Sequence, residues 1–196
     1  MMIDHDFIME GDESLLDDLT VIGGSRTSTA YGDHLAAEFA TGLAAGGRTI
    51  GVEMTAGIAS AAARALMAAG HPFVVCLASG LDTPQRPHLA PLRDRAALVV
   101  TPHEDDRPYS RKRAQESRQL LAHLAHRVVI IEARREGSDL DLAWAAIHSG
   151  TMLYATPGPL TSLESEGSND LIVTGDAQAI TTPGMLMLGM RERSTP

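Results

Sequence analysis

Short β-branched apolar runs alternate with amphipathic stretches along most of this 196-residue chain. Such alternation is typical of βαβ units, in which helices join parallel strands that are buried on both faces. The runs predict strands at residues 20–23, 49–53, 73–77, 97–101, 128–132, 152–155 and 178–181. The stretches between them predict helices at residues 31–45, 58–69, 110–125, 140–149 and 168–174. We therefore expect an α/β fold, a single Rossmann-like, doubly wound, mostly parallel sheet with helices on both faces.

One domain accounts for most of the chain, because this length suits a single buried core. The acidic residues 1–18 and the tail 183–196 are interpreted as flexible ends around a domain at residues 19–182. No apolar run approaches the roughly 20 residues of a membrane span, and the N-terminus lacks the charge order of a signal peptide. We therefore expect a cytoplasmic protein that does not engage a membrane.

The charge balance weakens nucleic acid as a partner without excluding it. The formal net charge is −9, whereas phosphate binding relies on clustered lysine and arginine. Seven acidic residues lie within the first twenty positions, which contain no basic residue. Subtracting their charge from −9 leaves −2 for the rest of the chain, where a local basic patch can still form.

The loop after the first predicted strand has the composition of an anion-binding turn. Gly23 and Gly24 permit close backbone approach, while Ser25 and Arg26 add a hydroxyl and a guanidinium that can grip phosphate. A helix is expected to begin just afterwards, and free N–H groups at a helix N-terminus attract anions. The spacing is neither the G-x-G-x-x-G of dinucleotide folds nor a P-loop. The alternative is an ordinary strand-to-helix turn with a solvated arginine.

Three long connections leave the carboxyl ends of predicted strands, at residues 79–94, 102–108 and 158–168. In a doubly wound sheet, ligands bind beyond these ends. We expect all three connections to border the same crevice as the opening loop.

Two further segments are candidates for this crevice. Residues 55–57 precede a helix rich in small residues, which is either a structural helix or a second wall of the site. Basic residues gather between positions 107 and 118, where helical spacing puts Arg111, Gln115 and Arg118 on one stripe. Such a stripe either follows a sugar-phosphate backbone or is a solvated helix face. The aromatic residues available for base stacking are Tyr31 and Tyr109.

Catalytic and metal chemistry find little support in the sequence. The eight histidines show no metal-ligand spacing, and no serine stands in a G-x-S-x-G elbow. Glu132, Asp139 and Asp141 lack a positioned nucleophile or metal nearby in the sequence. We expect no catalytic residue, no metal and no cofactor, and hence a binding protein in preference to an enzyme.

Five segments occur in an order that is specific, although each alone is a weak motif. They are VIGGSRTSTAYG, TAGIASAAARAL, SGLD, HRVVIIEARREGSDLDLAWAAIHSGTMLYATPG and EGSNDLIVTGDA. Together they resemble the DNA-processing protein A (DprA/Smf) family, from about residue 19 to residue 177. The resemblance implies the family's Rossmann-like domain, which binds single-stranded DNA. It also implies a homodimer that loads a RecA-type recombinase onto single strands during recombination or natural transformation.

The resemblance further implies a site made of a phosphate-holding loop, a facing loop, a basic pocket and a bracing amide. By this resemblance, Gly24, Ser25 and Arg26 would hold the phosphate, and Thr55 and Gly57 would form the facing loop. Arg113 and Arg118 would extend the basic pocket. Asn169 would brace or touch the ligand near Pro157 and Gly158.

A second function remains open on the same crevice. Proteins of the lysine-decarboxylase-like (LOG) group hydrolyse nucleoside monophosphates through a P-G-G-x-G-T-x-x-E motif. The stretch PGPLTSLES resembles it in Pro157, Gly158 and Glu164 but has lost the other glycines. The alternative to single-stranded DNA binding is therefore a sensor or a hydrolase of free nucleotides.

Overall fold

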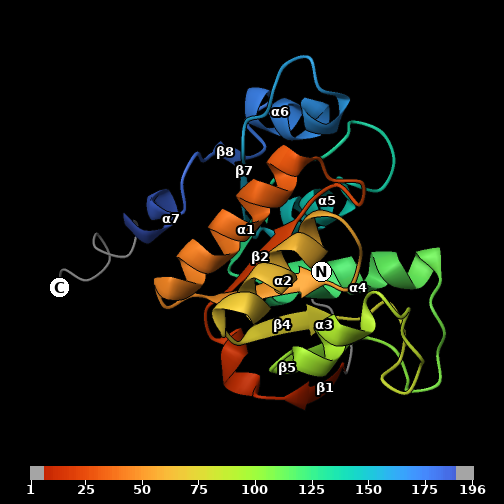
Figure 1. Ribbon diagram of the computed structural model, residues 1–196. Coiled ribbons are helices and arrows are strands. Elements are labelled where there is room, and N and C mark those ends of the chain that lie inside the picture. The colour runs from red at the N-terminus through yellow and green to blue at the C-terminus, as the bar shows by residue number, and fades with distance from the viewer. Residues whose placement is uncertain (1–6, 189–196) are drawn as a thin grey trace.

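The computed structural model describes residues 7–188, which form one sheet covered by helices (Figure 1). Within these residues the strand order is β1-β5-β4-β3-β2-β6-β7-β8, and only β1 runs antiparallel to its neighbour. The strands are β1 (Ile8–Gly11), β2 (Leu19–Gly23), β3 (Thr49–Glu53), β4 (Phe73–Cys76), β5 (Leu98–Thr101), β6 (Arg127–Ile130), β7 (Met152–Ala155) and β8 (Gln178–Ala179). The helices are α1 (Ala30–Ala45), α2 (Ile58–Ala69), α3 (Ala90–Arg95), α4 (Arg111–Leu124), α5 (Asp141–Ser149), α6 (Glu166–Val173) and α7 (Gly184–Leu188).

The sheet is doubly wound about β2. Helices α1 and α2 pack together on one face, on the viewer's side in Figure 1, and α4 and α5 pack together on the other. Side chains of β2 alternate between the two cores, since Ile22 joins the α1/α2 side while Leu19 and Val21 join the α4/α5 side. The chain moves outward from β2 to β5, then returns to β6 on the other side of β2. These features confirm the expected α/β fold and place its topological switch point between β2 and β6.

Residues 7–18 and 183–188, near the two ends of the described chain, contain regular secondary structure. Residues 7–18, expected to be flexible, contain β1, which pairs with β5, and the short 3₁₀ helix η1 (Glu13–Leu16). Residues 183–188 contain α7, whose Leu186 is buried against the α1/α2 core. The expectation of flexible ends is wrong for these two segments because each one buries apolar side chains or completes the sheet. Residues 1–6 and 189–196 lie outside the described part of the chain.

Arg48 connects the segment before β2 with helix α7. The Arg48 guanidinium, whose side chain is 2% exposed, donates to Asp18 at 2.6 Å and to the Leu186 carbonyl at 2.9 Å. Asp18 also accepts from Arg127 at 2.6 Å. Partial burial raises the pKa of Asp18, but the hydrogen bonds and charges of Arg127 and Arg48 lower this pKa by a larger amount. The pKa of Asp18 therefore lies below its ordinary value of 3.8.

Asp18→Asn should therefore destabilise the fold by about 1–2 kcal/mol, less than a fully buried ion pair would, because Asp18 is partly exposed. The pKa of Asp18 is depressed in the folded state, so its stabilisation is present above the ordinary value of 3.8 and disappears as pH falls through the folded value. Urea unfolding of both proteins at neutral pH and near pH 3 measures this. A stability difference that persists unchanged at acid pH would contradict the assignment.

Candidate nucleic-acid interface

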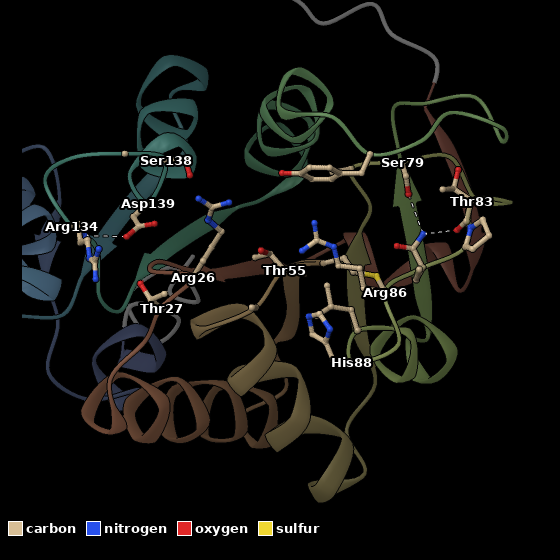
Figure 2. Close-up of a pocket in the computed structure, with 18 of the residues that line it drawn as sticks. Arg26, Thr27, Thr55, Ser79, Thr83, Arg86, His88, Arg134, Ser138 and Asp139 are labelled. Atoms are coloured by element: carbon tan, nitrogen blue, oxygen red, sulfur yellow. Dashed lines mark hydrogen bonds between the residues drawn. The ribbon is translucent and has the colours of Figure 1, made fainter.

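A groove of about 490 Å³ lies beyond the carboxyl ends of the parallel strands. Loops that follow β2, β3, β4, β5 and β6 all contribute to its lining, as expected from the switch-point topology. Side chains labelled in Figure 2 include Arg26 and Thr27 after β2, Thr55 after β3, Ser79 and Arg86 after β4, and Arg134 and Asp139 after β6. Of the three long connections that the sequence placed at this edge, residues 79–94 line the groove, whereas residues 102–108 and 158–168 do not; the loop after β5 contributes Tyr109 instead.

The loop after β2 is fixed by its backbone. Gly24 has a φ of +147°, and a Cβ there would overlap the carbonyl oxygen of Glu132. That same carbonyl accepts from the Ser25 N–H at 2.6 Å. The Ser25 side chain is fully buried, so its hydroxyl faces the interior and not the groove. The tight turn thus serves to project Arg26, the next residue, outward.

The loop after β3 holds the other side of this turn. Ile58 N–H donates to the Ser25 carbonyl at 3.0 Å. Gly57 has a φ of +74°, and a Cβ there would overlap that carbonyl oxygen. Thr55, two residues before Gly57, lines the groove. The two loops that the sequence nominated are therefore in direct contact, and glycine is required where they meet.

Two arginines present unpaired guanidinium groups to the groove. Arg26 and Arg86 are both exposed, and neither has an ion-pair partner within residues 7–188. Figure 2 shows them on either side of Thr55. Glu136 and Asp139 line the groove as well, on the loop after β6. The groove therefore has a cationic centre and one acidic wall, so an anionic ligand is attracted to the side of the arginines.

The N-terminus of α1 already holds an anion of the protein itself. The buried Glu132 carboxylate accepts from the Thr29 N–H at 3.0 Å and from the Thr29 hydroxyl at 2.7 Å. Gly32 lies directly against it, because a Cβ there would overlap a carboxylate oxygen. The helix end that the sequence offered as a ligand cradle is thus occupied by Glu132. No local pattern signals this contact, because Glu132 follows β6 and lies 103 residues from Thr29 along the chain.

Arg118 is not part of an exposed cationic stripe. It lies four residues after Ala114 and three before Leu121, both buried, and so shares their inward face of α4. There it donates to Glu53 at 2.9 Å and to Asp141 at 3.0 Å. Burial raises the pKa of Glu53 above its ordinary value of 4.5, while Arg118 opposes that rise. Arg118 thus lines only a small recess beneath Arg26, where two carboxylates already neutralise it.

Arg134 and Glu164 connect two loops beside the groove. The Arg134 guanidinium binds the Glu164 carboxylate, with Nε donating at 2.8 Å. Glu164 also accepts from the Ser25 hydroxyl at 3.3 Å. The Arg134 hydrogen bond lowers the pKa of Glu164, which therefore stays ionised. The glutamate that suggested a hydrolase motif is thus engaged in holding the loop after β2.

The remaining predicted residues lie outside the groove lining. The Arg113 guanidinium turns back to the Pro108 carbonyl at 2.7 Å. The Asn169 amide clamps Gly158, accepting from its N–H at 3.0 Å and donating to its carbonyl at 3.1 Å. The Tyr31 hydroxyl donates to the Pro157 carbonyl at 2.8 Å. These contacts give Asn169 and Tyr31 bracing positions around the loop after β7.

The sequence did not single out Arg86. Its loop was expected to border the crevice, but nothing distinguished this arginine from other exposed ones. The available signal was its place between Pro84 and Pro87, in a long connection after a buried strand.

Residues 7–188 contain neither a membrane-spanning helix nor a group of metal-binding side chains. In the part of the chain that the structure describes, no helix is both long and apolar enough to cross a membrane. Nor do any three His, Cys, Asp or Glu side chains among residues 7–188 gather in a way that could hold a metal ion.

Comparison with known proteins assigns the chain to a family. The sequence model of the family described as DNA recombination-mediator protein A matches residues 6–190. The chain belongs to this family. A DNA processing protein DprA from Mycobacterium tuberculosis is 34% identical to it over 162 residues, and protein Smf from Escherichia coli is 29% identical over 165 residues. These matches cover 81% and 82% of this chain but only 41% and 44% of the two relatives.

A solved family structure has the same fold. The structure of DNA processing protein A from Helicobacter pylori, which concerns that protein's single-stranded DNA binding mode, superimposes with a TM-score of 0.84 at 21% identity. The match covers 95% of this chain and 87% of that one. The family's fold therefore extends across β1 and α7, beyond the stretch of residues that the motifs alone had suggested.

Proposed function

We propose that this protein binds single-stranded DNA in the groove and acts in DNA processing and recombination. The observation that carries the proposal is Arg26, which a doubly anchored glycine turn projects into a groove without any carboxylate partner among residues 7–188. Membership of the DNA recombination-mediator protein A family supports the substrate class. The single-stranded DNA binding of the Helicobacter pylori protein supports it further.

In the proposed mechanism, exposed arginine side chains on a hydrogen-bonded loop bind the phosphate groups. Ser25 and Gly24 supply the fixed backbone, and Arg26 supplies a fork of N–H donors that matches phosphate oxygens. Because the groove has few aromatic side chains, sequence-independent contacts to the sugar-phosphate backbone dominate the affinity.

Arg26→Ala tests this mechanism. Loss of one charge-assisted phosphate contact should weaken binding of a fluorescein-labelled single-stranded oligonucleotide by about 10- to 100-fold. The slope of log affinity against log salt should also become shallower by about 0.7. Fluorescence anisotropy over a series of salt concentrations measures both quantities. Arg64→Ala is the matched control, because Arg64 is exposed on α2 and has no ion pair within residues 7–188.

Titration with free AMP separates this function from nucleotide sensing or hydrolysis. We expect AMP to bind far more weakly than the oligonucleotide, because it offers one phosphate to a groove with two free guanidinium groups. Tight AMP binding without oligonucleotide binding would refute the proposal. The engagement of Glu164 by Arg134 and Ser25 gives no support to a hydrolytic role.

From the resemblance to this family we further propose a cytoplasmic homodimer, not bound to a membrane, that delivers single strands to a RecA-type recombinase, as in natural transformation. Light scattering on the purified chain tests the dimer. Recombinase filament formation on oligonucleotides, with and without this protein, tests the loading activity.

A further inference from the structure

One end of the groove is formed by an arginine stacked on a tyrosine. The Arg86 guanidinium carbon lies 5.8 Å from the centroid of the Tyr109 ring, within the range of a cation–π contact. The two residues come from different loops, after β4 and after β5, and both line the groove. The Tyr109 side chain remains half-exposed, so much of its ring is open to solvent.

The charge of the groove favours this end as the path of a bound strand. Glu136 and Asp139 line the wall formed by the loop after β6 and repel phosphates there. Arg86 lies across Thr55 from Arg26 and adds the second free guanidinium (Figure 2). A chain of phosphates that starts at Arg26 therefore gains from continuing toward Arg86.

Tyr109 is also the better placed of the two stacking candidates in the sequence. Among the groove-lining residues that the structure describes, it is the only tyrosine, phenylalanine or tryptophan. Tyr31 instead donates its hydroxyl to the Pro157 carbonyl and lies outside the groove lining. A base that accompanies the phosphate at Arg86 thus has one phenol ring within the groove on which to stack.

We propose that Arg86 and Tyr109 form a second nucleotide subsite, in which Tyr109 stacks on a base and Arg86 binds the adjoining phosphate. The subsite rests on the proposed single-stranded DNA binding and extends it from one gripped phosphate to a defined two-point contact. Recognition is independent of base identity, because every base offers a π-face. The subsite also predicts that a polymer binds more tightly than a mononucleotide.

The test compares labelled oligothymidylate with an abasic oligonucleotide of the same length. Tyr109→Leu should weaken binding of oligothymidylate by between about 5-fold and about 150-fold. The same variant should leave abasic binding and the salt slope unchanged, because it removes no charge. Tyr109→Phe should bind both probes as the unaltered protein does, because the ring is retained.

Arg86→Gln should act differently, by making the salt slope shallower by about 0.7 for both probes. Arg64→Gln is the control for a general loss of charge. For both probes, its effect on affinity and salt slope should be smaller than that of Arg86→Gln. Both substituted groove residues are exposed, and circular dichroism verifies that the variants fold.

The outcomes separate the subsite from the proposed function. If Tyr109→Leu binds oligothymidylate as tightly as the unaltered protein while Arg26→Ala loses binding, the subsite is refuted and the proposed function stands. If Arg86→Gln and Arg64→Gln weaken binding equally, Arg86 contributes only general charge and the subsite is again refuted. If the unaltered protein binds neither probe, the proposed function fails, and the subsite fails with it.

Discussion

Gly57→Ala is expected to destabilise the protein by about 2–6 kcal/mol and to remove oligonucleotide binding. A residue with a Cβ at a φ of +74° and a ψ of −137° costs about 1–3 kcal/mol, and the overlap with the Ser25 carbonyl adds a further penalty of about 1–3 kcal/mol. The loop after β2 can relieve that overlap only by moving, which breaks the Ile58–Ser25 hydrogen bond and displaces Arg26. Urea unfolding and anisotropy measure the two effects.

Gly70→Ala is the matched control for this substitution. Gly70 ends α2 with the same φ of +74°, but its ψ of 20° places it in the left-handed helical region, and a Cβ there would meet nothing within 4 Å. It should lose only about 1–2 kcal/mol and keep its full affinity for the oligonucleotide. If both variants bind the oligonucleotide under conditions where both are folded, the contact between the two loops does not position Arg26.

Arg118→Met is expected to destabilise the fold by about 3–5 kcal/mol, because it leaves the Glu53 carboxylate buried without its partner. The effect depends on pH. Burial already raises the pKa of Glu53, and the loss of Arg118 raises it further, so folding favours the protonated acid. The variant should be closest to the unaltered protein near or below pH 4.5, where Glu53 is protonated, and fall behind as pH rises.

The double variant Glu53→Leu/Arg118→Met separates a structural role of Arg118 from a phosphate contact. Apolar replacement of a whole buried ion pair is often neutral, so most of the lost stability should return. The double variant should also have the oligonucleotide affinity and salt slope of the unaltered protein. A double variant that folds normally but binds with a shallower salt slope would restore Arg118 to the list of phosphate ligands.

The sheet could be predicted because each strand is a local signal. The run at residues 19–23 is apolar and buried on both faces, which only a central parallel strand requires. The strand β1 carries no such pattern, since Glu10 and Gly11 are exposed and its pairing partner β5 lies almost ninety residues away. Edge strands and short terminal helices such as α7 depend on what they pack against, and this information is not local.

The site could be predicted only in part, for the same reason. Arg26 and Gly57 follow strands directly, so the general rule for doubly wound sheets places them at the crevice. The fate of a charged side chain depends on its partners. Arg118 on α4 and Arg86 on the loop after β4 both line cavities at this edge of the sheet, yet Glu53 and Asp141 neutralise the first, whereas the second has no carboxylate partner within residues 7–188. Those carboxylates meet Arg118 only in the folded chain.

The Glu132 carboxylate at the start of α1 determines what kind of molecule this groove can select. In a dinucleotide-binding fold, backbone N–H groups at this position hold a pyrophosphate in one fixed orientation. Here the Thr29 N–H and hydroxyl donate to Glu132, and the Gly32 N–H donates to that hydroxyl, so a carboxylate of the protein lies where the pyrophosphate would. Phosphate is therefore attracted by long, exposed side chains with several rotatable bonds, such as Arg26. A site of this kind tolerates many phosphate positions, which suits a polymer that can be held anywhere along its length and released by a shift of register.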